Sequence, residues 1–478
     1  MYDKIIYELS KVDRIGYSLP NNNIGDFTLD AAFKRQTPLD MPEVTELDVV
    51  RHYTKLSQKN YGVDQGFYPL GSCTMKYNPK IDEELASNPG FTKIHPLQTE
   101  SSVQGALEVY YETSRLLGEL TGMAEFTFNP FAGAHGELVG LMIMKQYHLN
   151  RGDLKRTKVI VPDSAHGTNP ASSSVCGFDV IEVPSTIRGT VDLAALKKVI
   201  TDEVAGIMLT NPNTAGIWEN EIREMTKLMH DNGSLVYYDG ANLNAILGMA
   251  RPADMGFDIM HINLHKTFST PHGGGGPGSG PVGVVSKLVD LLPNPRVRKT
   301  NNKFAFLNSD QAIGAISGFW GNFLVVVRAY CYILSLGQEN VANVSKLAVL
   351  NANYIKEALK DDYKLPIPGL CKHEVVFDGL ISGAATTLEV AKRLLDYGYH
   401  PPTIYFPLLF HQAMMIEPTE NESKETLDDF IAVMKKIAEE AKTNPELLHD
   451  APHNTLVRRL DEVKAARNPI LKYKDLLK

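Results

Sequence analysis

The sequence contains few cysteines and no long uninterrupted apolar run. Its four cysteines are spread over 478 residues without a Cys-x-x-Cys pair, which excludes a disulfide scaffold and is typical of reduced thiols in the cytoplasm. The longest apolar stretch, residues 323–336, is interrupted by Arg328 and is too short to span a bilayer. The N-terminal residues carry charges throughout and lack the apolar core of a signal peptide. We therefore expect a cytoplasmic protein without membrane contact.

An excess of basic charge is also missing. The chain has 48 lysines and arginines against 56 aspartates and glutamates, a net charge of −8. Nucleic acids and anionic membranes are normally bound through a basic surface, so neither is an expected partner. Basic residues gather between positions 464 and 478, but acidic residues interrupt them, which is typical of a solvated tail. With 43% hydrophobic and 22% charged residues, the composition is that of a soluble globular protein.

Three regions are expected along the chain, within the range of about two to four domains that its length suggests. Proline, asparagine and glycine cluster repeatedly within residues 1–100, which predicts an irregular arm that wraps over the rest. Residues 101–330 alternate short apolar runs with segments of helical spacing, which predicts a large domain. Residues 331–478 follow a looser pattern and predict a smaller C-terminal α+β domain.

The large domain is expected to have an α/β architecture, with a mainly parallel sheet covered by helices on both faces. Its expected strands are residues 159–161, 180–183, 207–209, 235–238 and 259–263. Its expected helices start behind a cap at Ser101 or Ser102, run from a cap at Asp192 to residue 200, and cover residues 138–147 and 221–232. The smaller domain is expected to contain helices at 338–360, 387–397 and 423–442 and strands at 375–377 and 413–416.

Polar residues follow several of the expected strands. His166, Asp239 and Lys266 each come shortly after a strand, and ligands of open parallel sheets bind beyond the carboxyl ends of the strands. Together these residues match the needs of pyridoxal phosphate, which requires a lysine amine for a Schiff base and a carboxylate that keeps the ring nitrogen protonated. The imidazole can stack on the ring. Residues 132–136, which precede an expected helix, resemble a helix N-terminus suited to a phosphate.

Each residue also has a plainer interpretation. Lys266 can be a solvated lysine, Asp239 can serve a turn, and His166 can be an ordinary loop residue. The glycine run at 273–276 can be a surface loop, and it is not a dinucleotide fingerprint because prolines follow it in place of a helix. From the residues alone, the inference stops at an α/β enzyme with a candidate pyridoxal-phosphate site.

Metal and nucleotide sites are not expected. His261 and His265 are four residues apart, but they lie on an expected strand without the glutamate of a His-Glu-x-x-His motif. The sequence also contains no Walker A motif, which disfavours nucleotide hydrolysis.

Residues 261–278, which read HINLHKTFSTPHGGGGPG, resemble the lysine segment of the glycine decarboxylase P-protein family of the glycine cleavage system. Further segments resemble this family in order along nearly the whole chain. They are FYPLGSCTMKYNP at 67–79, NPFAGAHGE at 129–137, PDSAHGTNPA at 162–171, TNPNTAG at 210–216, YYDGANLNAI at 237–246, HPPTIYFP at 400–407 and IEPTE at 416–420. Long single-chain members carry the lysine in their C-terminal half, and this chain resembles that half.

The resemblance implies a fold-type-I pyridoxal-phosphate enzyme and assigns roles to individual residues. It implies that Lys266 forms the Schiff base with the cofactor, Asp239 contacts the pyridine nitrogen, and His166 stacks on the ring. It places the phosphate-binding turn at the start of an expected helix, and a donor to the phenolic oxygen three residues after the aspartate. The further cofactor-binding positions that it implies are Gly133, Ala134, His135, Asn242 and His265.

The resemblance also implies a reaction and partners. The expected activity is that of glycine dehydrogenase (aminomethyl-transferring, decarboxylating), which releases CO₂ from glycine and transfers the aminomethyl group to the lipoyl disulfide of H-protein. The chain resembles subunit 2 of a two-subunit form, so we expect a lysine-lacking subunit 1 and a heterotetramer of two subunit pairs. Cys73 is expected near the lipoyl channel or the subunit contact.

Two alternatives stay open. One is another pyridoxal-phosphate reaction on an amino acid, which would need no lipoyl acceptor. The other is a non-catalytic scaffold subunit, against which the presence of both Lys266 and Asp239 counts.

Overall fold

The computed structural model describes residues 4–17, 20, 21, 23, 25, 27–273 and 278–476. These residues form two compact units, a large one of residues 66–453 and a smaller one that joins residues 1–65 to residues 454–478. The expected division at residues 100 and 330 stays a prediction. Residues 274–277, most of the glycine run, lie outside the described residues.

The smaller unit contains short helices from both chain ends. Thr45 caps α1 (Glu46–Ser57) in a capping box with Asp48, which satisfies N–H groups that the helix itself leaves unpaired. The rings of Tyr7 and Tyr473 stack with centroids 4.7 Å apart and join the two ends. Its other helices are η1 (Ile6–Leu9), α14 (Glu462–Arg467) and α15 (Tyr473–Leu476).

A seven-stranded sheet forms the centre of the large unit, in the order β1-β7-β6-β5-β4-β2-β3. The strands are β1 (Glu125–Thr127), β2 (Lys158–Pro162), β3 (Asp179–Val183), β4 (Val204–Thr210), β5 (Leu235–Gly240), β6 (Ile259–Ile262) and β7 (Val282–Val284). The five expected strands are confirmed as β2 to β6 and run parallel. β7 runs antiparallel to both neighbours, so the expected mainly parallel sheet is confirmed.

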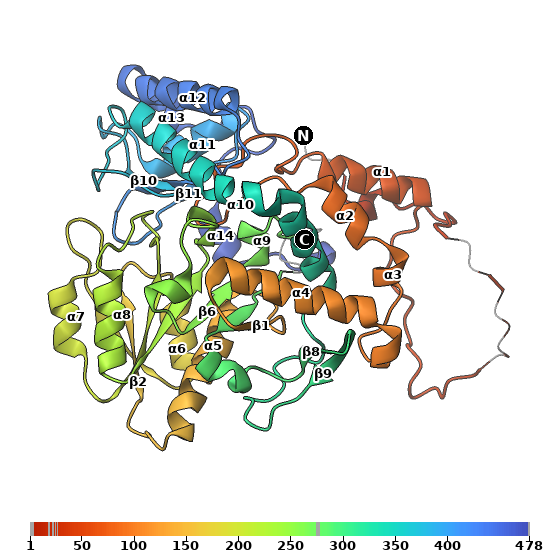
Figure 1. Cartoon of the computed structure of the whole chain (residues 1–478). Coiled ribbons are helices and arrows are strands. Elements are labelled where there is room, and N and C mark those ends of the chain that lie inside the picture. Colours follow the sequence, from red (N-terminus) through yellow and green to blue (C-terminus); the bar gives the residue numbers. More distant parts are fainter. Residues whose placement is uncertain are drawn as a thin grey trace. The chain divides into compact units, whose positions relative to one another are not determined.

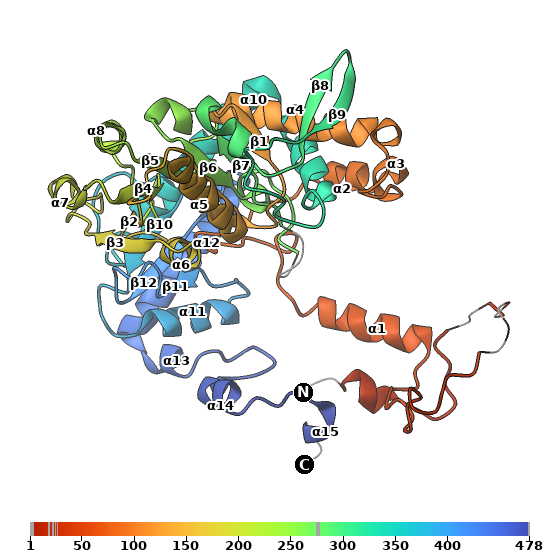
Figure 2. The ribbon, with the colours of Figure 1, turned by 90° about the horizontal axis from the view of Figure 1, so that it is seen from below.

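Helices cover both faces of this sheet because successive strand residues point to opposite sides. In β4, Ile207 and Leu209 belong to the apolar cluster that includes residues of α7 and α8. Met208, between them, packs instead in the cluster that contains residues of α5. Figure 2 shows α7 and α8 on one side of the strands and α5 and α6 on the other. These helices are α5 (Gly133–Asn150), α6 (Thr168–Val175), α7 (Leu193–Val199) and α8 (Ile222–Asp231).

One expected helix cap is confirmed and one is wrong. The side chain of Asp192 accepts hydrogen bonds from the N–H groups of Ala194 and Ala195, so it caps α7. Ser101 and Ser102 instead lie in a short 3-10 helix, η2 (Glu100–Ser102), and α4 (Gln104–Thr121) begins after Val103. The hydroxyl of Ser102 donates to the carbonyl of Thr99 at 2.8 Å and makes no cap bond to α4.

The C-terminal part of the large unit has its own three-stranded antiparallel sheet, in the order β10-β12-β11. α10 spans Phe323–Leu359 with a non-helical Gly337, so the expected helix at 338–360 is its second part and the apolar stretch is its first. Figure 1 shows the helices of this part grouped around its strands. The elements are β10 (Val375–Asp378), β11 (Thr403–Ile404), β12 (Ala413–Ile416), α11 (Thr387–Asp396), α12 (Lys424–Thr443) and α13 (Glu446–His449).

The remaining elements of the large unit are short. They are α2 (Lys80–Ala86), α3 (Pro89–Thr92), α9 (Leu264–Thr267), η3 (Leu243–Ala245), η4 (Pro252–Met255), η5 (Ser286–Leu291) and the hairpin of β8 (Arg296–Thr300) and β9 (Lys303–Leu307). The helices α1 to α3 lie within the N-terminal hundred residues. In the part of the chain that the structure describes, no helix combines the length and apolar character that crossing a bilayer requires.

A segment N-terminal to α2 packs on the small sheet. Leu70 forms a bridge with Ile416, and the carbonyl of Gly71 accepts a hydrogen bond from the hydroxyl of Thr403 at 2.8 Å. A side chain at position 71 would collide with Met415, so only glycine allows this approach. Ser72, the next residue, lines the cavity at the large sheet that is described below.

Candidate active site

A cavity of about 230 Å³ lies where several strands of the large sheet end. Seven of the eight site residues expected from the sequence line it, and His135 is the exception. Among the described residues that line it, Lys266 is the only lysine or arginine. The lining residues are Ser72, Ala132, Gly133, Ala134, Glu137, His166, Thr168, Thr210, Thr214, Asp239, Ala241, Asn242, His261, Asn263, His265 and Lys266.

Asp239, in β5, is buried and surrounded by donors. Its carboxylate accepts hydrogen bonds from Asn169 Nδ2 and the N–H of Ala241, each at 3.0 Å, and lies 3.3 Å from Nε2 of His261. Burial alone would raise the pKa of Asp239, but His261, the two donors and the charge of Lys266 outweigh it and hold this pKa below its ordinary value. Asp239 is therefore a buried carboxylate that stays ionised.

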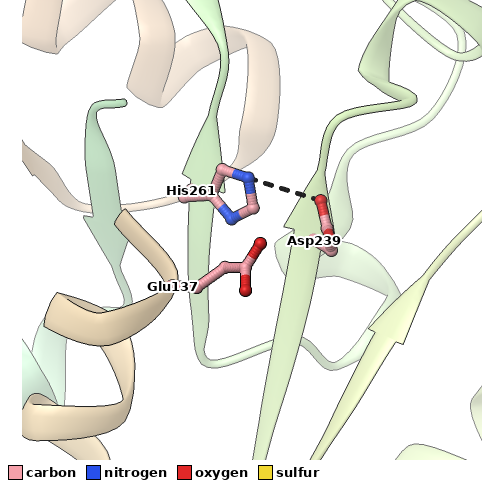
Figure 3. A group of neighbouring side chains, drawn as sticks. All are labelled: Glu137, Asp239 and His261. Atoms are coloured by element: carbon pink, nitrogen blue, oxygen red, sulfur yellow. Dashed lines mark ion pairs between the residues drawn. The ribbon is translucent and has the colours of Figure 1, made fainter. Parts of the chain in front are cut away.

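His261 and Glu137, which the sequence did not single out for this site, lie beside Asp239 (Figure 3). The hydroxyl of Tyr237 lies 2.7 Å from Nδ1 of His261, and burial lowers the pKa of this histidine. A neutral His261 that accepts at Nδ1 presents its own proton at Nε2, toward Asp239. Glu137 accepts hydrogen bonds from Thr168 at 2.7 Å and Ser172 at 3.0 Å. Burial, with the charge of Asp239, raises the pKa of Glu137 to about 7.

Lys266 lies in α9, a single turn that directly follows β6. Its N–H donates to the carbonyl of Asn263 at 3.0 Å, which fixes the backbone of this turn. The charge of Lys266 contributes to the pKa values of both Asp239 and His265, and all three residues line the cavity. The arrangement brings an amine and a buried carboxylate from consecutive strand ends into one cavity.

His265 is neutral at physiological pH. Burial and then the neighbouring His272 and Lys266 lower its pKa to about 3. Its Nδ1 is buried and has no hydrogen-bond partner among the described residues, whereas His261 contacts Tyr237 and Asp239. Asn263 contacts both histidines, and the residues that could together offer atoms to a metal ion are Glu137, Asp239 and His261.

The first turn of α5 borders the cavity. Its N-cap residue, Ala132, is extended and provides no side-chain cap, so the first N–H groups of this 18-residue helix can bind an anion. A side-chain Cβ at position 133 would stand 2.7 Å from the amide nitrogen of Asn263, so Gly133 keeps this space open. His135 lies in the same turn, but its side chain turns away and accepts from the N–H of Phe131 at 3.3 Å.

Asn242 lines the cavity, but its amide group is engaged elsewhere. It donates to the carbonyls of Pro212 at 2.9 Å and Asn213 at 3.2 Å, so the donation to the cofactor expected of it has no hydrogen available in this conformation. Thr210, at the end of β4, has a buried hydroxyl without a hydrogen-bond partner among the described residues. This threonine was missed because a single threonine after a strand gives no distinctive signal.

His166 lies on the exposed side of the cavity, after β2. Its Nδ1 is 2.8 Å from the hydroxyl of Thr168, and its ring centroid is 5.5 Å from that of Phe406. This hydrogen bond fixes the direction of the imidazole, which the loop alone would leave free to rotate.

The residues present fit pyridoxal phosphate. The cavity contains an amine, an ionised carboxylate, an uncapped helix N-terminus and an imidazole, which are the groups this cofactor requires. Three of its lining residues also keep a buried polar atom without a partner in the described part of the chain, and such atoms call for a ligand or water. They are Thr210 Oγ1, Asn263 Oδ1 and His265 Nδ1.

The chain matches known proteins over almost all of its length. Residues 11–303 match the sequence model of the "Glycine cleavage system P-protein", and residues 344–459 match "Glycine dehydrogenase, C-terminal domain". A curated relative from Caldanaerobacter subterraneus, "Probable glycine dehydrogenase (decarboxylating) subunit 2", is 60% identical over 99% of both chains. A relative of the same name from Alkaliphilus oremlandii is 58% identical over 99% of this chain and 98% of its own.

Solved structures share the fold of this chain. A glycine decarboxylase P-protein in inhibitor-bound form has a TM-score of 0.72 at 20% identity, covering 84% of this chain and 92% of its own. A glutamate decarboxylase from Lactobacillus brevis has a TM-score of 0.66 at 12% identity, covering 89% and 96%. The large mainly parallel sheet with a smaller C-terminal part is the architecture of fold-type-I pyridoxal-phosphate enzymes. The chain belongs to the glycine cleavage system P-protein family, among the proteins named glycine dehydrogenase (decarboxylating) subunit 2.

Proposed function

We propose that the chain is the cofactor-binding subunit of a pyridoxal-phosphate-dependent glycine dehydrogenase (aminomethyl-transferring, decarboxylating). The observation that carries this proposal is the presence of Lys266 and the ionised Asp239 in one cavity of a P-protein family member. When bound, pyridoxal phosphate supplies an electron-withdrawing ring that accepts the electron pair left as glycine loses CO₂.

Asp239 supports this chemistry through its charge. A buried carboxylate held ionised by His261, Asn169 and a backbone N–H can keep a proton on a pyridine nitrogen, because opposite charges attract strongly away from water. His261 in turn is oriented by Tyr237, which fixes the hydrogen that it presents to the carboxylate. These contacts are preorganised, so they need not form during the reaction.

The remaining residues bind and orient. Lys266 would attach the cofactor through its amine, and the first turn of α5 would bind the phosphate through the N–H groups of Gly133, Ala134 and His135. His166 would lie on the ring face and Thr210 would donate to a cofactor oxygen. His265 and Asn242 would border the cofactor. Neither would place a charge beside it, since His265 is neutral and an amide carries no charge.

The partners follow from the family. We expect a lysine-lacking subunit 1, a heterotetramer of two subunit pairs, and the lipoylated H-protein as acceptor of the aminomethyl group. Surface composition supports a protein partner, because large apolar side chains are exposed along residues 12–41, and such clusters are typical of interaction surfaces. They are Val12, Ile15, Tyr17, Phe27, Leu29, Phe33, Leu39 and Met41. The four free thiols agree with a reducing cytoplasm.

Borohydride reduction of the loaded protein, followed by peptide mapping, tests the proposal. We expect the cofactor tag on Lys266 alone, together with glycine-dependent exchange of labelled CO₂ that requires the lipoyl protein. A tag at another residue would exclude the assignment. Exchange without a lipoyl acceptor would favour a different amino-acid decarboxylase, and a tagged protein without any exchange would favour a scaffold subunit.

A further inference from the structure

A second group of titratable residues lies beside the cavity, on the small sheet. Glu374 directly precedes β10 and Glu417 directly follows β12, and the pairing of Val375 with Ile416 places them next to each other. One side-chain atom each of Glu374, Glu417 and His373 lie within 4.8 Å of one another. All three side chains are completely buried.

The two carboxyl groups hold the segment that reaches the cavity. Glu374 accepts a hydrogen bond from the N–H of Ser72 at 2.9 Å. Glu417 accepts from the N–H of Thr74 at 2.9 Å and from its hydroxyl at 2.6 Å. Ser72 and Thr74 have positive φ angles of 64° and 49°, a conformation that costs free energy for residues other than glycine. Ser72 also lines the cavity of Lys266, so it connects the pair to the active site.

The two carboxyl groups have no lysine or arginine partner among the described residues. In the described part of the chain, neither forms an ion pair with a lysine or arginine, and His373 Nε2 stays 3.7 Å from Glu374 and 3.9 Å from Glu417. Both ring nitrogens of His373 and Oε1 of Glu374 lack a hydrogen-bond partner there. Burial lowers the pKa of His373 to about 3, so its ring is neutral and does not balance the charge.

Burial instead favours the protonated carboxyl form. It raises the pKa of Glu417 to about 7, and burial with the charge of Glu417 raises the pKa of Glu374 well above its ordinary value. The charge of Lys266 acts on both carboxyl groups in the opposite direction. The other titratable groups around the pair are Cys73, Cys371, His373 and Glu420, of which Glu420 is ion-paired with Lys76 at 2.7 Å.

Glutamine would serve a purely structural role better. An amide oxygen at position 374 can accept from Ser72, and an amide at position 417 can accept from the N–H of Thr74 and donate to its hydroxyl, without placing an ionisable group in the protein interior. Two unpaired buried glutamates are therefore costly as structural residues, and ionisable groups of this kind cluster at functional sites.

We propose that Glu374 and Glu417, which hold Ser72 at the border of the cavity, share one proton and act as a proton store for Lys266. This inference deepens the proposed function and rests on it. Before the amine of Lys266 can bond to a carbonyl carbon, its ammonium must lose a proton. The N–H bond breaks, the electron pair stays on nitrogen, and the proton passes to a carboxylate oxygen of the pair. The proton returns when Lys266 is released as the free amine.

The test compares the full-length protein with the E374Q/E417Q double variant, loaded with pyridoxal phosphate. The absorbance band of the lysine–cofactor linkage is titrated with pH, and thermal unfolding is followed over the same range. Because a carboxylate favours a nearby protonated nitrogen, we expect the midpoint of the absorbance titration to fall by about 1 pH unit in the double variant. Each single variant keeps one carboxyl group, so its shift is expected to be smaller.

Glu219→Gln is the matched control. Glu219 is also buried, accepts hydrogen bonds from the N–H of Val191, and has a pKa raised by burial to about 7, but the charge of Lys266 does not contribute to it. We expect this variant to change the pH dependence of unfolding and to leave the absorbance titration as in the parent protein.

Two results would overturn the inference. One is an unchanged absorbance midpoint in the double variant, which would make the pair structural only. The other is a stoichiometric divalent metal in the parent protein that the double variant lacks, which would make the group a metal site. If the double variant fails to fold, difference infrared spectra of the parent protein decide, because a proton store requires a protonated carboxyl band that changes on cofactor binding. Absence of any lysine–cofactor band in the parent would instead contradict the proposed function.

Discussion

Two buried clusters, each containing two carboxyl groups and a histidine, lie on different sheets of the same unit. Glu137, Asp239 and His261 border the large sheet's cavity, whereas His373, Glu374 and Glu417 lie at the end of the small sheet. Both are buried, so burial does not distinguish them. Asp239 is ionised because a histidine, an amide and a backbone N–H face it.

In the second cluster, neighbouring groups do not favour the ionised carboxylate in this way. Its histidine side chain makes no hydrogen bond in the described part of the chain, and burial with the charge of Glu417 raises the pKa of Glu374. The difference teaches that buried carboxyl groups beside a histidine provide a fixed negative charge at Asp239 and a place for a proton at Glu374 and Glu417. Their hydrogen-bond partners decide which, as expected when neighbouring groups set the pKa.

The largest effect is expected from removing Lys266, whose charge acts on carboxyl groups of both clusters. Lys266→Ala removes the amine that would attach the cofactor, so glycine-dependent exchange of labelled CO₂ should fall by at least about a thousandfold. The lysine–cofactor absorbance band should disappear. Lys287→Ala, which removes an exposed lysine paired with Asp258, is the control and should keep both signals. Full exchange activity in the Lys266 variant would refute its role.

Removing the fixed charge of the first cluster should have the next largest effect. Asp239→Asn keeps the shape of the side chain but loses its charge, and kcat should fall by about 100- to 1,000-fold while some cofactor stays bound. Asp258→Asn is the matched control. Asp258 directly precedes β6 and is also buried, and its carboxyl group lies 2.8 Å from Nε2 of His230. This control should lower stability and leave kcat per folded molecule unchanged. A normal kcat in Asp239→Asn would mean that another group holds the ring nitrogen.

A smaller effect is expected from filling the space beside the first cluster. Gly133→Ala places a methyl group 2.7 Å from the amide nitrogen of Asn263, so this amide must move at the helix end that would bind the phosphate. Cofactor affinity should fall by about tenfold, which corresponds to about 1.4 kcal/mol. Gly105→Ala, where the added methyl group meets nothing, should bind the cofactor as the parent does. Equal affinities, measured by absorbance titration, would contradict the assignment of this turn.

The smallest effect concerns the proton on Glu137. Its pKa is raised from 4.5 to about 7 in the folded protein, so its contribution to stability is complete below about pH 4.5 and is lost as pH rises to about 7. Glu137→Gln should remove this loss and make the protein more stable at pH 8 by about 1 kcal/mol. Urea unfolding at pH 5 and pH 8 measures it. A stability difference between parent and variant that is the same at pH 5 and pH 8 would show that Glu137 is not protonated when folded.

The fold was predicted well where apolar runs were long enough to carry a pattern. Strands β2 to β6 each occupy four to seven residues and were expected from their apolar character. β1 and β7 have three residues each, too few for a period to show, and they pair antiparallel only because residues far apart in sequence meet. Ser102 failed as a helix cap because its hydroxyl found a nearer carbonyl.

The site was predicted in part, through residues that follow strands. Lys266 and Asp239 could be expected because strand ends in a parallel sheet meet at one edge. Thr210 could not, since a single threonine after a strand is common. Asn242 donates to the carbonyls of Pro212 and Asn213, which follow another strand. The sequence therefore could not show that its amide is not available to the cofactor.

The sequence by itself determined the order of the parallel strands and the helices between them. It also determined which residues at the strand ends suit the cofactor, and the family. These depend on local periodicity and on motifs that lie within short segments. Only the tertiary structure decided the charge state of each buried acid and the approach of residues 72–74 to the cavity. Both depend on contacts between segments hundreds of residues apart, such as Ser72 with Glu374, and in a buried setting such contacts decide whether a carboxyl group is ionised.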